Sequence, residues 1–94
     1  MIFEWDEKKR KINLAKHKID FEEAKFVFYD ENAILIPDPD HSNSEERFVI
    51  LGFSNKSNLL VVCHCYRKNE EVIRIINARK ATANEKKLYA SKKG

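Results

Sequence analysis

Arg74 is the charged residue with the most unusual surroundings, because it interrupts the apolar stretch from Val72 to Ile76. An unpaired buried charge is too costly, so its guanidinium must reach water, a partner or a ligand. The planar fork of a guanidinium matches two oxygens of a phosphate group, which makes arginine well suited to bind a phosphodiester. The alternative is a structural ion pair with a carboxylate such as Glu45 or Glu46. The pattern alone leaves both interpretations open.

Arg79 lies on the same predicted strand, five residues beyond Arg74. In an unbroken strand this odd spacing sends the two side chains to opposite faces of the sheet. They can converge on one phosphate only if the strand ends or bulges near Asn77 and Ala78. A helix that starts at Thr82 favours such an end.

Arg47 is the third candidate, at the start of an earlier strand. It directly follows Glu45 and Glu46, so it is either a phosphate ligand or half of a local ion pair. Cleavage of a phosphodiester without a metal needs a general base, a general acid and fixed positive charge near the phosphate. The three arginines are candidates for the fixed charge.

Histidine and tyrosine side chains are the candidates for proton transfer. His64, in the middle of a strand, has a suitable pKa range, although a core histidine is the commoner alternative. His41 lies in a polar loop, and His17 ends a helix, where a cation suits the helix dipole. Tyr89 on the last helix could place its hydroxyl near the sheet or anchor the helix by its ring.

The triplet Cys63-His64-Cys65 has the residue types of a zinc site but not the geometry. Neighbouring strand residues point to opposite faces, so His64 cannot share one ion with both cysteines. An acidic loop upstream faintly resembles a calcium-binding loop, but its sixth position is Asn43 rather than glycine and its twelfth is Val49 rather than glutamate. We therefore expect no metal and no cofactor.

Capping residues and hydrophobic spacing predict three helices. Asp6 is a candidate N-cap for a helix that runs to about residue 17. Asp20 resembles the start of a capping box for a second helix that ends near residues 29–30. Thr82 with Glu85 forms a capping box for a third helix that reaches about residue 92.

Four segments of alternating or apolar character, 33–36, 47–53, 59–66 and 72–78, predict strands. Residues 54–58 and 67–70 are short enough for hairpin loops, which implies antiparallel pairing. Pro37 and Pro39 predict a turn after the first of these strands. Residues 2–5 form a short extended lead-in. The chain of 94 residues therefore predicts a single α+β domain over 1–94, with two N-terminal helices, a four-stranded largely antiparallel sheet and a C-terminal helix.

The net charge of +3 conceals three regions of different sign. Residues 1–19 carry +3, residues 20–46 carry −8 and residues 47–94 carry +8. A basic C-terminal half favours a face that binds a polyanion, while the alternative is simply a highly charged solvated surface. No apolar run is long enough for a signal peptide or a membrane span, so we expect a cytoplasmic protein whose two cysteines are free thiols.

Several of these residues fall into blocks that resemble the BrnT family of toxins. The first block is Phe3-Glu4-Trp5-Asp6 with Asn13, Lys16-His17-Lys18-Ile19 and Phe21-Glu22-Glu23-Ala24. The second is Asp38-Pro39-Asp40-His41 followed by Glu45-Glu46-Arg47-Phe48. The third is the run from Arg74 to Thr82, with Glu85 and Tyr89 beyond it. The visible departure is Asn77, where the family would more often have serine.

The resemblance implies a RelE-like fold and a ribonuclease that arrests translation. It also implies neutralisation by a DNA-binding antitoxin, BrnA, whose complex with the toxin represses their operon, so that operator DNA is reached only through the antitoxin. The site residues that it transfers are Arg47, Arg74, Arg79, Glu46, His64 and Tyr89.

Three functions remain open from the sequence. The first is a metal-independent endoribonuclease. The second is a non-catalytic module that binds RNA or DNA with the same basic face, because arginines that contact phosphates serve both roles. The third is a structural partner subunit of a regulator.

Overall fold

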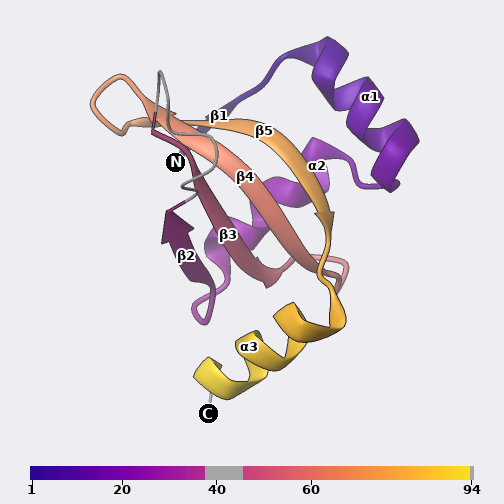
Figure 1. Cartoon of the computed structure of the whole chain (residues 1–94). Helices are drawn as coiled ribbons and strands as arrows, with labels where there is room; N and C mark the ends of the chain where they lie inside the picture. Colours follow the sequence, from indigo (N-terminus) through magenta and orange to yellow (C-terminus); the bar gives the residue numbers. More distant parts are fainter. Residues whose placement is uncertain (38–45, 94) are drawn as a thin grey trace.

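The computed structural model describes residues 1–37 and 46–93 (Figure 1). Its elements follow in the order β1 (Ile2–Glu4), α1 (Glu7–His17), α2 (Phe21–Ala24), the 3₁₀ helix η1 (Lys25–Tyr29), β2 (Ile34–Pro37), β3 (Phe48–Phe53), β4 (Leu59–Arg67), β5 (Val72–Lys80) and α3 (Ala83–Lys93). The predicted α+β class is confirmed. The predicted turn beyond Pro37, with His41, lies outside the described residues.

The sheet has five strands in the order β1-β5-β4-β3-β2, not the four that the sequence predicted. The extended lead-in is itself a strand, β1, and pairs in parallel with the start of β5. Hairpin connections could not have revealed this strand, because its partner lies about seventy residues away. Phe3 of β1 packs on Phe28 with ring centroids 5.4 Å apart, which fixes the strand against the core. The other three pairings are antiparallel, as predicted.

A β-bulge interrupts the pairing of β5 with β4. Cys63 pairs with Asn77 and His64 pairs with Ile75, so Ile76 is one extra residue on β5. Such a bulge leaves one residue unpaired and resets the alternation of side chains on its strand. The sequence favoured an end of the strand near Asn77 and Ala78, whereas β5 continues to Lys80 and the bulge at Ile76 meets the alternative condition.

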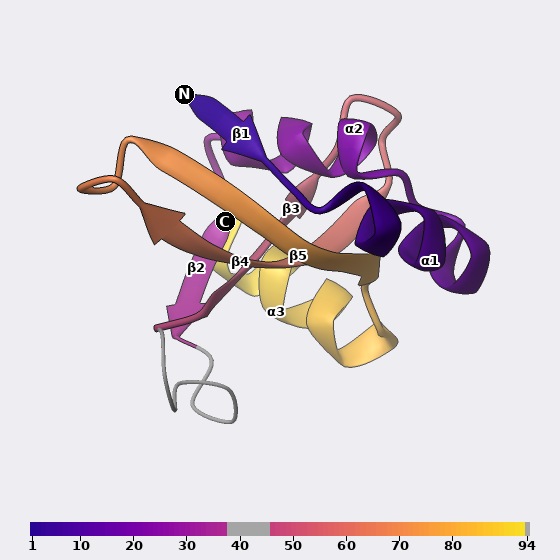
Figure 2. The same cartoon turned by 90° about the horizontal axis from the view of Figure 1, so that it is seen from above.

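The sheet separates two layers of helices (Figure 2). On one face, α2 and η1 cover a core built on Phe21, Val27, Leu60, Val62 and Ile75. On the other face, α3 packs on a smaller cluster through Tyr89. Among the described residues no helix combines the length and apolar character needed to cross a membrane.

The predicted helix starts are confirmed. The Asp6 carboxylate accepts from the backbone N–H groups of Lys8 and Lys9, and Asp20 caps α2 in the same way. Thr82 and Glu85 form a reciprocal capping box at the start of α3.

The second predicted helix is correct in extent, but its second half is the 3₁₀ helix η1 rather than α-helix. Tightened 3₁₀ turns are common at helix ends, and aromatic and β-branched residues fill this segment. It also lies close to Gly52 of β3, where an added Cβ would come within 3.0 Å of the side chains of Val27 and Ala33. Glycine at this position therefore allows η1 to approach the sheet.

Candidate active site on the β5 side of the sheet

Arg74 is held in an ion pair with a strand neighbour. Its Nη1 donates to Oε2 of Glu4 on β1 at 2.8 Å, and Nε of Arg67 lies 3.6 Å from the same oxygen. The parallel register places Glu4 directly beside Arg74. This partner, Glu4, was missed by sequence reasoning, which had considered Glu45 or Glu46; Glu45 lies outside the described residues. The Arg74 side chain keeps 30 % of its surface exposed, so it is accessible to a ligand.

Arg79 has a bidentate partner on the following helix. Its two terminal nitrogens donate to the two carboxylate oxygens of Glu85 at 2.8 and 2.9 Å. Glu85 also accepts from the backbone N–H of Thr82. The hydrogen bonds from Arg79 and then from Thr82 lower the pKa of Glu85 to about 2, against the opposing effect of burial. Glu85 thus fixes Arg79 relative to the start of α3.

Arg47 directly precedes β3, and its Nε is buried without a hydrogen-bond partner among residues 1–37 and 46–93. Phe48 pairs with His64, so one further step of the same register sets Arg47 level with Cys65. Cys65 in turn pairs with Arg74 on the other side. Arg47 and Arg74 therefore lie on either side of Cys65, and their backbones are roughly 10 Å apart across three strands.

The bulge determines which face these arginines share. Beyond it, Arg79 pairs with Val61, and Val61 alternates onto the same face of β4 as Cys63 and Cys65. Without the extra residue at position 76, Arg74 and Arg79 would point to opposite sides. We call the side that carries Arg47, Arg74, Asn77 and Arg79 the arginine face.

Arg74 and Arg79 are nevertheless well separated along β5. Five residues of strand span roughly 15 Å, and each guanidinium is held by its own carboxylate. This spacing does not favour the convergence of both arginines on one phosphate that was considered from the sequence. The spacing favours contacts of the two arginines with separate phosphates of one nucleic-acid strand.

His64 lies on the opposite face, in the core. It is fully buried, with its ring 4.7 Å from Phe28 in an edge-to-face contact. Nδ1 lies 3.1 Å from the carbonyl oxygen of Val62, and Nε2 lies 3.3 Å from the Tyr66 hydroxyl. Burial lowers the pKa of His64 below its usual range, which keeps the ring neutral. The structure thus places His64 as a core residue, the commoner of the two predicted roles.

Two other predicted residues, Tyr89 and Glu46, have surroundings of their own. Tyr89 is buried, packs edge-to-face on Phe53 and donates its hydroxyl to Asp30 at 2.7 Å. Burial, followed by this hydrogen bond, raises the pKa of Tyr89 to about 12. Glu46 is exposed and lines a hollow with Phe48 and Tyr66, on the His64 side of the sheet. Neither side chain contacts Arg74 or Arg79.

Asn13 is a second residue that sequence reasoning missed as a structural determinant. Its amide donates to the carbonyl oxygens of Ile19 and Ala78, both at 2.9 Å, and its Oδ1 accepts from the Ala78 N–H at 3.0 Å. The side chain thereby pairs with β5 where β1 has ended. Asn13 is the buried residue of α1, whereas its apolar neighbours Ile12 and Leu14 are exposed, so hydrophobic spacing could not reveal its role.

The cysteines of β4 and the described histidines lie too far apart, or on opposite faces, to form a metal cluster. Cys63 and Cys65 are buried, form no disulfide and lie on the face opposite His64, as strand alternation required. Within the described part of the chain, no three His, Cys, Asp or Glu side chains come close enough to hold an ion.

Comparison with known proteins assigns a family to this geometry. The family model described as the ribonuclease toxin BrnT of type II toxin–antitoxin systems matches residues 5–85. The chain belongs to the BrnT family. The crystal structure of the Brucella abortus ribonuclease toxin BrnT superposes with a TM-score of 0.67 at 26 % identity, over 87 % of this chain and 99 % of that one. A search of curated proteins finds no match.

Membership of the BrnT family confirms the predicted resemblance. The matched region contains Arg47, Arg74, Arg79 and Glu85, whereas Glu4 lies just outside it. As a BrnT-family protein, the chain is a ribonuclease toxin of a type II toxin–antitoxin system, with RNA as the substrate class and an antitoxin as partner.

Proposed function

We propose that this BrnT-family chain is an endoribonuclease that cuts RNA on the arginine face without a metal ion. The observation that carries the proposal is the bulge at Ile76, which gives Arg74 and Arg79 a common face. Arg47 and Arg74 flank the buried Cys65 on this face, so their two guanidinium groups are candidates to contact one phosphate.

In this arrangement the reacting phosphate lies between Arg47 and Arg74. The 2′-hydroxyl gives its proton to solvent water and attacks the adjacent phosphorus. The bond to the 5′-oxygen breaks, and the departing oxygen takes up a proton from solvent. Negative charge grows on the phosphate oxygens during this step. Fixed guanidinium groups stabilise that charge without reorganisation, and Glu4 restrains the Arg74 side chain in position. Arg79, which is held by Glu85, binds a phosphate further along the RNA chain.

The test is cleavage of a defined RNA in excess chelator. The purified chain is expected to cut and to leave a 2′,3′-cyclic phosphate and a 5′-hydroxyl. Complete loss of cutting in chelator with rescue by magnesium, or a 5′-phosphate on the product, would contradict the mechanism. RNA that is bound but never cut would instead support a non-catalytic binding module.

The partner in this proposal is a cognate DNA-binding antitoxin of the BrnA type, which alone would contact operator DNA. The activity is proposed to act in the cytoplasm and to arrest translation. Expression of the chain alone is expected to stop growth, and co-expression of the neighbouring reading frame is expected to restore it. Normal growth with the chain alone at a verified protein level would contradict the toxin role.

A further inference from the structure

A basic pocket lies beside the arginine face, where α1 flanks the edge of β5. β1 pairs only with residues 72–74 of β5, so the edge beyond is free of a neighbouring strand. The lining of the pocket includes Lys9, Lys16, His17, Ile76, Asn77 and Arg79. Arg79 and Asn77 belong to both the pocket and the arginine face, so the two surfaces are continuous.

The pocket is built by the docking of α1. The hydrogen bonds between Asn13 and Ala78 fix the helix against β5. Lys9 and Lys16 stand four residues before and three residues after Asn13, so both lie on the side of the helix that faces the strand. The bulged residue Ile76 supplies an apolar wall. The basic side chains are thus brought together by the fold rather than scattered over a solvated helix.

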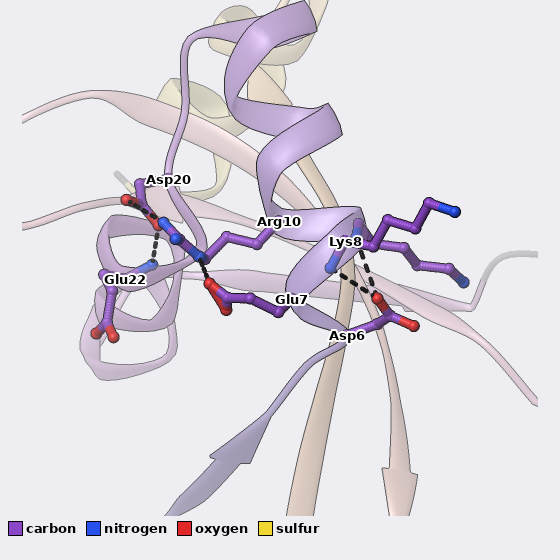
Figure 3. A network of polar contacts seen from close by, with 7 residues as sticks. Asp6, Glu7, Lys8, Arg10, Asp20 and Glu22 are labelled. Carbon is purple, nitrogen blue, oxygen red and sulfur yellow. Dashed lines mark hydrogen bonds and ion pairs between the residues drawn. The ribbon is translucent and has the colours of Figure 1, made fainter.

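The lining of the pocket contains no carboxylate. By contrast, Arg10 on the same helix is paired with Glu7 and with Asp20, toward which it points (Figure 3). Lys16 and His17 gain from the negative end of the helix dipole, but Lys9 lies in the first turn, where that dipole opposes a cation. The stability of the helix therefore does not explain Lys9.

The charges of Lys9 and Arg74 both act on the carboxylate of Asp6 at the start of α1. Backbone hydrogen bonds from Lys9 and Lys8 lower the pKa of Asp6, and the charges of the Lys9 and Arg74 side chains lower it further. Both cations are therefore within electrostatic reach of one carboxylate at the start of α1.

We propose that this pocket is a second phosphate-binding site, which holds the RNA backbone beside the segment that is cut. RNA then crosses from the sheet over the edge of β5 onto α1. The site rests on the proposed ribonuclease function and specifies where flanking nucleotides bind. Lys9 and Lys16 are its new phosphate ligands.

The test uses an RNA with 2′-O-methyl groups throughout, which cannot be cut by its own 2′-hydroxyl. Binding is measured against salt for the wild type, for Lys9→Ala/Lys16→Ala and for Lys8→Ala/Lys11→Ala. The control pair removes two exposed lysines from the same helix that do not line the pocket. For single strands each lost phosphate contact changes the slope of log affinity against log salt by about 0.7, so the pocket pair is expected to flatten it by about 1.4. The control pair is expected to retain the wild-type slope.

An equal change in the slope of log affinity against log salt for both double variants, or no change for either, would contradict phosphate binding in the pocket. Thermal melts of both pairs check that the variants are folded. Wild-type binding by Lys9→Ala/Lys16→Ala, together with normal RNA cleavage by the wild type, would reject this site and leave the proposed function intact. If the wild type binds but does not cut unmodified RNA, the ribonuclease proposal fails while the slopes still decide the binding site.

Discussion

Arg74 and His64 show how much a single residue reveals before its neighbours are known. A charge inside an apolar strand correctly indicated that Arg74 needs a partner or a ligand. The partner, Glu4, could not be inferred because the parallel pairing joins residues seventy positions apart. His64 was ambiguous for another reason: alternation placed it opposite the cysteines but did not show which face was covered. Phe28 and the buried ring settle that point.

The planar fork of Arg74 is expected to matter more than its charge. Lysine keeps the charge but loses the bidentate geometry that holds both Glu4 and a phosphate. One charged hydrogen bond contributes about 1.5–3 kcal/mol, so Arg74→Lys is expected to slow single-turnover cleavage about 10- to 100-fold. A rate within about twofold of the wild type would show that charge alone suffices.

His64 is expected to contribute to stability rather than to catalysis. His64→Asn opens space in the core and should cost about 2–4 kcal/mol of unfolding free energy, measured by denaturant titration. Cleavage below the melting temperature should remain near the wild-type rate. A folded His64→Asn protein with no activity would contradict this assignment.

The pKa of His64 also predicts a pH dependence. Because burial lowers it in the folded state, the unfolded state binds the proton first. The stabilisation that comes from the neutral ring is complete above the ordinary value of 6.5 and decreases as the pH falls below it. The difference in melting temperature between wild type and His64→Asn should therefore shrink on acidification from pH 7.5 to 5. A difference that grows would contradict a buried neutral ring.

At the scale of elements, caps and alternation predicted where the helices and the four antiparallel strands lie. The lead-in strand was missed because three residues are too few to show a period, and its pairing is not a hairpin. The bulge was foreseen only as a condition for Arg74 and Arg79 to converge, since no residue type marks it. The docking of α1 likewise depends on Asn13 reaching Ala78, a contact across 65 positions.

Asn13 is expected to hold α1 on β5. Asn13→Ala leaves the N–H and carbonyl of Ala78 and the carbonyl of Ile19 without this partner. Each buried unsatisfied group costs about 1–3 kcal/mol, and partial access of water reduces the sum, so a loss of about 2–4 kcal/mol is expected. Asn84→Ala, on the exposed first turn of α3, is the control. Equal stability of the two variants in urea would rule out this role for Asn13.

Glu85 links Arg79 to α3, and its contribution is expected to depend on pH. Its folded-state pKa of about 2 lies below the ordinary value of 4.5, so the stabilisation is present above 4.5 and is lost as the pH falls through 2. Glu85→Gln should lower the melting temperature at pH 7, with the difference from wild type shrinking toward pH 2. The exposed Glu71→Gln is the control. A difference that does not change with pH would contradict the ion pair.

Over the whole molecule, the basic N- and C-terminal regions meet where α1 lies against β5. The sequence showed the two regions but not their contact, because Asn13 and the bulge create it. The result is that Arg79 of the arginine face lines one pocket together with Lys9 and Lys16 of α1. The central claim is that RNA is cut on the arginine face.

Single-turnover RNA cleavage by Arg74→Ala, with a thermal melt of the same sample, tests that claim most directly. The rate should fall about 10²–10³-fold because charge stabilisation in the transition state is lost. The ion pair with Glu4 is partly exposed and contributes at most about 1 kcal/mol, so the melting temperature should fall by less than about 8 °C. Arg10→Ala, which removes a cation already paired with Glu7 and Asp20, should cleave at the wild-type rate. A folded Arg74→Ala protein that cuts RNA as fast as the wild type would contradict the account.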